Sequence, residues 1–254
     1  MKVPVLNLTN EKIDEVDLPK VFGTSIRPDL IKRAVIAQQS HAYQPQGRDP
    51  MAGKHNVAES RGTGHAMARL PRLKNSSKAD FAVQAVGGHG AFPPRSEKIT
   101  VKNINKKEKR FAIRSGIAAT AVKEIVKARG HIIDGIPEIP IVLDDALESI
   151  QKTKEVEDIF KKMGLINDVN RSNRKKIRAG KGKGRGRGKK LGKGPLLVIT
   201  EDKGIGKAAR NLPGVDVTVL RNLNTELLAP GAHPGRLVVW VKSAFNAIDE
   251  TWEG

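Results

Sequence analysis

The chain has 254 residues, no cysteine, and 46 Lys and Arg against 27 Asp and Glu, which gives a formal net charge of +19 at pH 7. A chain without cysteine has no disulfides, thiolate zinc sites or thiol nucleophiles, and this is typical of an intracellular protein. The longest apolar run is only residues 237–241, so we expect no membrane span, which needs about 20 apolar residues. The first residues lack the apolar centre of a signal peptide.

The positive charge is concentrated in two segments. Residues 44–95 contain eight Lys or Arg and three acids, and residues 171–193 contain twelve Lys or Arg and no acid. Together these segments carry +17 of the +19 charges. The pattern predicts a nearly neutral domain with two basic appendages that bind a polyanion.

The first elements in chain order are a short strand, a helix and a long loop. Residues 2–8 alternate as a strand does, and a helix begins near Pro28 and fades at residues 41–45. Residues 44–95 then run without a helical or strand period and hold seven of the 25 glycines and five of the 14 prolines. A loop this polar cannot bury its own backbone, so it is either disordered or ordered by an anionic partner.

Residues 106–129 form the clearest predicted helix, with Gly130 as its stop. Its expected buried face consists of Phe111, Ala118, Val122, Ile125 and Val126. Small residues at 115–119 would let the helix lie close against a sheet. Its first turns are rich in Lys and Arg, the unfavourable sign at a helix N-terminus, which a nearby anion would relieve.

The middle of the chain predicts a strand at 139–143 and a helix at 154–163. Between them, Asp145 and Glu148 form a capping-box pattern, which we favour over a metal or acid pair at Asp144 and Asp145. After the second basic segment, strands alternate with helices. The strands are expected at 196–200, 215–220 and 237–242, and the helices at 204–211, 224–228 and 243–252, the last capped by Ser243.

This order predicts an α/β fold with a Rossmann-like, mostly parallel sheet covered by helices on both faces. Residues 1–43 and 96–254 would form one globular domain. Residues 44–95 would be a long extended basic loop inserted in it, and residues 171–193 an internal Gly/Lys/Arg-rich tract.

Few residues suggest catalysis. The run AGKGKGRGRGKK at 179–190 is no Walker loop, because no Gly-Lys-Ser/Thr closes it; it is either a disordered linker or a bound segment. Gly204 and Gly206 partly match a dinucleotide fingerprint, but Ala209 stands at the third glycine position. Four of the six histidines lie in or beside the long loop without a carboxylate cluster, so a zinc site is not indicated. With 4% aromatic residues, phosphate and shape contacts should dominate over stacking.

Four blocks in order resemble the universal large-subunit ribosomal protein L-four family in its archaeal and eukaryotic form. Residues 58–73 (AESRGTGHAMARLPRL) resemble its loop tip, and residues 109–131 with 136–142 its central helix and strand entry. Residues 177–183 (IRAGKGK) resemble its basic motif, and residues 201–245 its C-terminal third, so the similarity runs almost end to end.

The resemblance implies a structural, non-enzymatic protein of the cytoplasmic ribosome, with a Rossmann-like domain on the outside of the large subunit. The loop would reach through rRNA to the wall of the peptide exit tunnel. Expected partners are large-subunit rRNA, neighbouring ribosomal proteins and, near the loop tip, the nascent peptide. No membrane, homo-oligomer or cofactor is expected, and structural Mg²⁺ ions would belong to the rRNA.

The expected rRNA-binding residues come from both basic segments. In the loop they are Arg48, Lys54, Arg61, Gly62, Thr63, Gly64, His65, Arg69, Arg72, Lys74 and Arg95. In the tract they are Arg174, Lys175, Lys176, Arg178, Lys181, Lys183, Arg185, Arg187, Lys189 and Lys190. The tip expected nearest the tunnel consists of Arg61, Gly62, Thr63, Gly64, His65 and Arg69.

Two other functions stay open from the residues alone. The first is an RNA-modifying or nucleotide-dependent α/β enzyme that uses residues 204–206, with the basic segments as substrate clamps. The second is a chromatin-type duplex binder.

Overall fold

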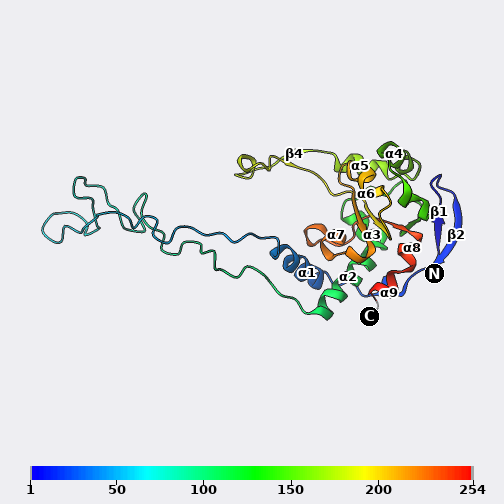
Figure 1. Cartoon of the computed structure of the whole chain (residues 1–254), viewed down its shortest axis with the longest axis horizontal. Coiled ribbons are helices and arrows are strands. Elements are labelled where there is room, and N and C mark those ends of the chain that lie inside the picture. The colour runs from blue at the N-terminus through cyan, green and yellow to red at the C-terminus, as the bar shows by residue number, and fades with distance from the viewer. Residues whose placement is uncertain (1, 253–254) are drawn as a thin grey trace. The chain divides into compact units, whose positions relative to one another are not determined.

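The computed structural model describes residues 2–252 (Figure 1). The chain divides into two units: one runs up to Gln39 and resumes at Asn103, and the other is Ser40–Lys102. The predicted loop, residues 44–95, lies inside the second unit. No helix of the described chain is long and apolar enough to cross a bilayer.

The first unit contains a six-stranded sheet with the strand order β2-β1-β3-β8-β6-β7. All neighbouring strands are parallel except β1 and β2, which confirms the predicted mostly parallel sheet. The strands are β1 Lys2–Leu6, β2 Lys12–Asp17, β3 Ile141–Leu143, β6 Leu196–Ile199, β7 Asp216–Val219 and β8 Val238–Val241.

The last strand, β8, lies at the centre of the sheet. Trp240 is in register with Val142 of β3 and with Val198 of β6. Every residue of β6 and β8 is buried, because an uninterrupted apolar run suits a parallel strand that is covered on both faces.

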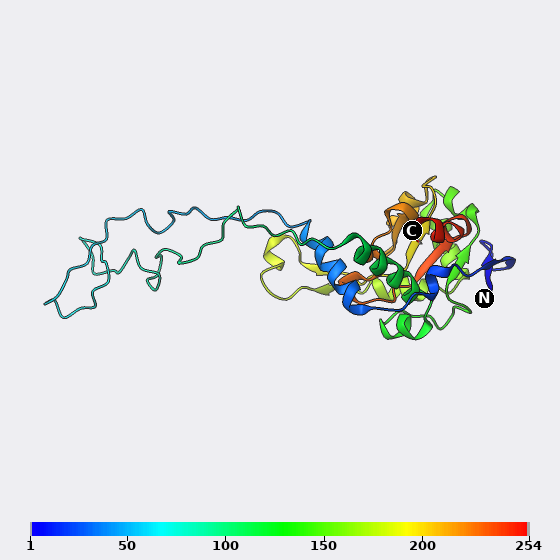
Figure 2. The same ribbon diagram turned by 90° about the horizontal axis from the view of Figure 1, so that it is seen from below.

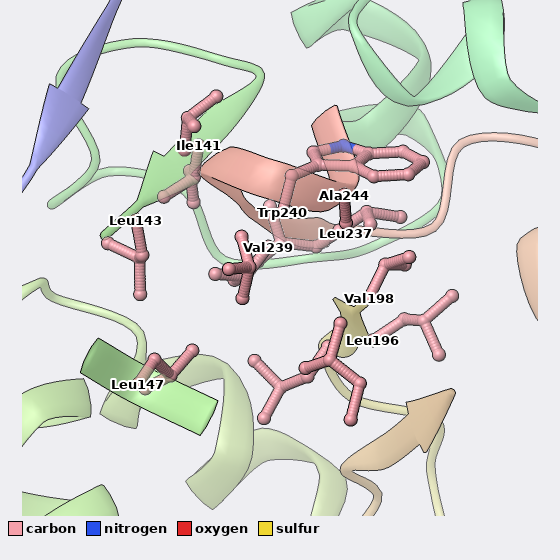
Figure 3. Packing of buried hydrophobic residues seen from close by; sticks show 14 of the residues in the cluster. Ile141, Leu143, Leu147, Leu196, Val198, Leu237, Val239, Trp240 and Ala244 are labelled. Carbon is pink, nitrogen blue, oxygen red and sulfur yellow. The ribbon is translucent and has the colours of Figure 1, made fainter. Parts of the chain in front are cut away.

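The core extends to both sides of β8. In Figure 3, Trp240 points to one side of this strand, and Val239 points to the other side, toward Leu147. The Trp240 ring lies 6.0 Å from Phe22 and 6.3 Å from Phe245, both in edge-on geometry. Such pairs favour one arrangement of the aromatic rings beyond the burial of their area.

The helices agree with most of the predicted ones. They are α1 Pro28–Ser40, α2 Lys106–Thr120, α3 Lys123–Ala128, α4 Thr153–Lys162, α5 Ile166–Ser172, α6 Ile205–Arg210, α7 Thr225–Leu228, α8 Lys242–Asn246 and α9 Ile248–Trp252. The predictions near α1, α4, α6 and α7 are confirmed. The sequence reading missed β2 and α5.

β2 was missed because it is an edge strand. Its residues are mostly charged and exposed, so they show no apolar alternation. Figure 2 shows β1 and β2, in dark blue, at the margin of the folded unit.

The predicted helix at 106–129 is wrong in two respects. It is two helices, because Val122 takes an extended conformation between α2 and α3. Val122 is also 36% exposed, whereas Val126 is fully buried. The change of direction between the helices lets Val126 pack into the core without burying Val122.

Two of the small residues of α2 make close contacts outside the sheet. A Cβ added at Gly116 would lie 3.2 Å from the Leu228 side chain of α7. Ser115 Oγ accepts a hydrogen bond of 2.7 Å from the Arg27 backbone N–H. These small residues therefore admit α7 and the chain that precedes α1.

The predicted capping box is also wrong. Asp145–Ser149 forms a 3-10 helix without a side-chain cap. The Asp145 carboxylate instead accepts from the backbone N–H and the hydroxyl of Ser243, at 2.9 and 2.5 Å. Glu148 accepts from the backbone N–H groups of Thr200 and Glu201, at 2.7 and 3.2 Å. Donors brought near by the fold replace the local capping partners.

The prediction of a single last helix at 243–252 is wrong as well. Residues 243–252 form two helices, α8 and α9, with Ala247 between them. Ser243 lies inside α8 and is bound to Asp145, so it is not the cap that the sequence indicated.

Candidate nucleic-acid interface

The Gly/Lys/Arg-rich tract forms a hairpin. Its first two residues, Arg171 and Ser172, still belong to α5. Lys176–Ile177 (β4) then pairs with Lys189–Lys190 (β5) in antiparallel register. The backbone N–H of Arg178 donates to Gly188 O at 2.8 Å, and that of Arg187 donates to Gly182 O at 3.1 Å. The tract is thus a two-stranded projection from the sheet (Figure 1).

Two ion pairs, each with one buried and one partly exposed partner, hold the base of this hairpin. Arg236 is fully buried; its Nε donates to Gly194 O at 2.9 Å and its Nη2 to Asp216 at 2.6 Å. Arg171 binds Asp168 at 2.8 Å through Nε and donates to Lys193 O at 2.6 Å through Nη2. Both contacts fix the backbone where the tract rejoins the sheet.

Between its first and last cations, Arg171 and Lys193, which bind Asp168 and Asp216, the hairpin carries ten further cations. Within the described chain, none of its ten predicted binding residues forms an ion pair with a carboxylate. Nine of the ten are exposed, and Arg178 is half-buried. These ten residues are Arg174, Lys175, Lys176, Arg178, Lys181, Lys183, Arg185, Arg187, Lys189 and Lys190. Ten unneutralised charges on one hairpin repel each other, and a polyanion relieves this repulsion.

The Ser40–Lys102 unit has neither helix nor strand between residues 44 and 95. An isolated antiparallel bridge joins Glu59 and Arg72, whose backbones exchange two hydrogen bonds of 3.0 Å. Ser60 Oγ donates to Arg69 O and accepts from the Gly62 N–H. The bridge therefore closes a tip loop.

This tip loop brings together the residues predicted nearest the tunnel: Arg61, Gly62, Thr63, Gly64, His65 and Arg69, all exposed. Gly62 and Gly64 have φ values of 73° and 84°, which L side chains rarely adopt. Arg48, Lys54, Lys74 and Arg95 are also exposed, and Arg72 is half-buried. Lys74 lies 3.5 Å from Glu59. Contacts of all these residues with rRNA stay a prediction.

The backbone N–H groups of the glycine turn at 204–206 already bind a carboxylate of the same chain. The backbone N–H groups of Gly204 and Gly206 both donate to Asp202 Oδ1 at 3.0 Å. A nucleotide phosphate would need these same donors. The Asp202 carboxylate therefore occupies the place where a dinucleotide-binding loop holds its ligand.

No group of three or more His, Asp or Glu in residues 2–252 is arranged to hold a metal ion. His131 instead pairs with Asp168, with 2.9 Å between Nδ1 and Oδ2. The sequence reading missed this pair and the cavity beside it, because Arg129, His131 and Asp168 are distributed over separate predicted elements.

Comparison with known families decides the class of the protein. The model of the ribosomal protein L4/L1 family matches residues 16–251. The chain belongs to this family. The resemblance of the four sequence blocks is thereby confirmed.

Relatives in this family match over nearly their whole length. The "Large ribosomal subunit protein uL4" of Methanosphaera stadtmanae is 49% identical over 253 residues, which cover 99% of this chain and 98% of the relative. Its namesake from Archaeoglobus fulgidus is 50% identical over 251 residues, 98% of this chain and 99% of the relative. That of Methanopyrus kandleri is 48% identical over 256 residues, 98% of each chain.

Proposed function

We propose that this protein is a structural, non-enzymatic constituent of the large ribosomal subunit in the cytoplasm. It binds large-subunit rRNA and supports assembly of the subunit. The observation that carries this proposal is the hairpin of residues 171–193, in which ten of the twelve cations are exposed or half-buried and have no acidic partner in the described chain. These cations need a polyanion as partner. The chain belongs to a ribosomal protein family, and rRNA is the polyanion that a ribosomal protein meets.

The mechanism is electrostatic. Lys and Arg that neutralise RNA phosphates release condensed counterions, and this release drives binding. Glycine at alternate positions between 180 and 188 lets the backbone come close to the RNA. The buried Arg236–Asp216 pair, at 2.6 Å, fixes the base of the hairpin, so that less conformational entropy is lost on binding.

The Ser40–Lys102 unit is proposed as the second rRNA contact, an extended loop inserted in a Rossmann-like domain. Its tip at residues 61–69 would lie at the wall of the peptide exit tunnel, near the nascent peptide. The protein would act as one copy beside neighbouring ribosomal proteins. It would need no cofactor of its own, since Mg²⁺ ions would belong to the rRNA. The exposure of the tip residues and their resemblance to the family's loop tip support this assignment.

Binding of the full-length protein to large-subunit rRNA at several salt concentrations tests the hairpin contact. The test variant carries Gln at Lys181, Lys183, Arg185 and Arg187. It should bind more weakly, and the slope of log affinity against log salt should flatten by about 0.7 to 0.9 for each phosphate that the hairpin no longer neutralises.

The matched control removes the same charge from the exposed surface of the first unit, with Gln at Lys123, Lys127, Lys154 and Lys162. This control should keep most of the affinity and slope. If the hairpin variant binds as the unchanged protein does, the tract is only a linker.

Neither alternative function gains support. The Asp202 carboxylate occupies the glycine turn that the enzyme hypothesis needs. Saturable nucleotide binding that Gly206→Val abolishes would revive that hypothesis. A chromatin-type binder should prefer duplex DNA in competition, whereas the proposal expects preference for large-subunit rRNA.

A further inference from the structure

A cavity of the first unit, with a volume of about 750 Å³, lies at the base of the hairpin. Its cationic lining consists of Arg129, Arg171 and Lys193, and Glu226 is its only lining acid in the described chain. Arg171 and Lys193 are the first and last residues of the basic tract. A polyanion bound along the hairpin therefore passes the mouth of this cavity.

Arg129 is the cation that most requires an anion. Its Nη1 and Nη2 donate to the backbone oxygens of His233 and Pro230, the second at 2.8 Å. No carboxylate of residues 2–252 lies within ion-pair distance of it. Burial, with smaller effects of Arg236 and Arg171, lowers the pKa of Arg129 to about 10. The guanidinium stays charged at pH 7, half-buried and without a counter-charge.

Glu226 accepts a hydrogen bond from the Gln39 amide at 2.9 Å, and the two other nearby carboxylates are each shared between two basic groups. Asp168 binds Arg171 and His131, and Asp216 binds Lys193 at 3.0 Å and Arg236 at 2.6 Å. Because each carboxylate already serves two partners, neither compensates Arg129. An anion that enters the cavity would meet a net positive wall.

The rest of the lining is apolar or planar. Ile125, Ala128, Pro230 and Pro234 contribute hydrocarbon surface, and His131 and His233 contribute rings. A small anion such as phosphate needs only the cations. The combination of apolar walls, rings and cations suits a ligand that has both a phosphate and a flat heterocycle, and the volume lies in the range typical of small-ligand sites.

We propose that this cavity receives a single unpaired nucleotide of the RNA, with its phosphate bound by Arg129 and Lys193 and its base against the apolar wall. Single-stranded and bulged nucleotides are what proteins recognise most readily in RNA, because their bases are free to turn outward. The inference rests on the proposed function, since rRNA supplies the nucleotide. It adds a discrete nucleotide site to the electrostatic contact of the hairpin.

Titration of the full-length protein with adenosine 5′-monophosphate, followed by NMR of the histidine rings, tests the proposal. Two of the six histidines, His131 and His233, line the cavity. Their signals should shift saturably while those of the other four stay in place. Adenosine and inorganic phosphate should each bind at least about tenfold more weakly, because each can make only one of the two interactions.

Lys193→Gln should weaken nucleotide binding by about tenfold or more, the effect of removing one charge-assisted hydrogen bond. Its ammonium is half exposed, with 53% of the side chain accessible, so the fold should tolerate the change. Arg129→Gln should act in the same direction. Lys127→Gln, which removes a charge from the same helix outside the cavity, should leave binding unchanged.

Three outcomes would overturn the proposal: no saturable shift of His131 and His233, equal binding of inorganic phosphate or of adenosine, or an equal loss in Lys127→Gln. If the natural occupant is an acidic side chain of a neighbouring protein, the cations alone decide binding, and inorganic phosphate should bind as well as the nucleotide. The proposed function is tested separately. If the hairpin variant still loses rRNA affinity while the nucleotide fails to bind, only the cavity proposal falls.

Discussion

His131 is a buried, neutral imidazole, and this makes the protein sensitive to acid. Burial lowers its pKa from the usual 6.5; the Asp168 carboxylate opposes this, and the charges of Arg171 and Arg129 add to the lowering. The unfolded chain therefore takes up a proton on this ring at a higher pH than the folded protein does. The stability contributed by the neutral ring is complete above about pH 6.5 and is lost as pH falls through the lowered pKa.

We predict that the free energy of unfolding, measured with urea, falls between pH 7.5 and pH 5.5. His131→Gln should reduce this pH dependence, since Gln does not titrate, whereas His41→Gln at an exposed position should not. An unchanged slope in His131→Gln would show that other groups are responsible.

Gly214 is required by a close backbone approach. Its φ is 73°, and an added Cβ would lie 2.8 Å from Gly194 N and 2.6 Å from Ser172 Oγ. Gly130 is the matched control, because its φ is 98° but nothing lies within 4 Å of an added Cβ. Gly214→Ala should lower the free energy of unfolding by about 1 to 3 kcal/mol more than Gly130→Ala, the usual cost of overpacking. Equal losses in urea denaturation would contradict the close approach.

At the scale of elements, the hairpin depends on Arg236. This side chain is fully buried and donates to Gly194 O, Leu227 O and Asp216. Arg236→Gln would leave Asp216 with Lys193 as its one charged partner and would remove the guanidinium that binds the Gly194 and Leu227 carbonyl groups. We expect a loss of about 1 to 3 kcal/mol, the cost of leaving buried hydrogen-bond acceptors without their donor.

The hairpin should also become easier to cleave with trypsin in the Arg236→Gln variant. Arg221→Gln, at an exposed position of the same unit, serves as the control and should change neither stability nor cleavage. Stability equal to that of the control would mean that the base of the hairpin is held in some other way.

The strands and short helices of the C-terminal third were predictable because each depends on a pattern of neighbouring residues in the sequence. Leu196–Ile199 and Val238–Val241 are apolar runs of strand length, and the helix predicted at 224–228 is α7, with Asn224 as its cap. The place of β8 between β3 and β6 was not predictable, because strand order depends on how distant segments pair.

Side-chain roles that depend on distant partners were also missed. Asp145 looks like a helix cap, yet it binds Ser243, which lies 98 residues away. Arg236 looks like a loop charge between Gly235 and Leu237, and its burial follows only from the position of Asp216. Of the candidate interface, the sequence predicted the two basic segments, because the number of Lys and Arg in a segment can be counted without knowing how the chain folds. It did not indicate the cavity at Arg129 and Lys193.

At the scale of the whole molecule, charge and fold have separate roles. The first unit buries an apolar core around β8 and balances its interior charges in pairs such as Asp168–Arg171 and Asp216–Arg236. The ten hairpin cations between Arg174 and Lys190 are not paired in this way. Most of the unneutralised positive charge is therefore exposed, where a partner outside the chain can bind it.

Sedimentation of the tagged protein from cells on a sucrose gradient tests the central claim most directly. The protein should migrate with the large ribosomal subunit and stay there in high salt, because the proposed function gives it many contacts with rRNA at once. The variant with Gln at Lys181, Lys183, Arg185 and Arg187 should be released at lower salt. Protein found only at the top of the gradient, away from ribosomal particles, would contradict the account.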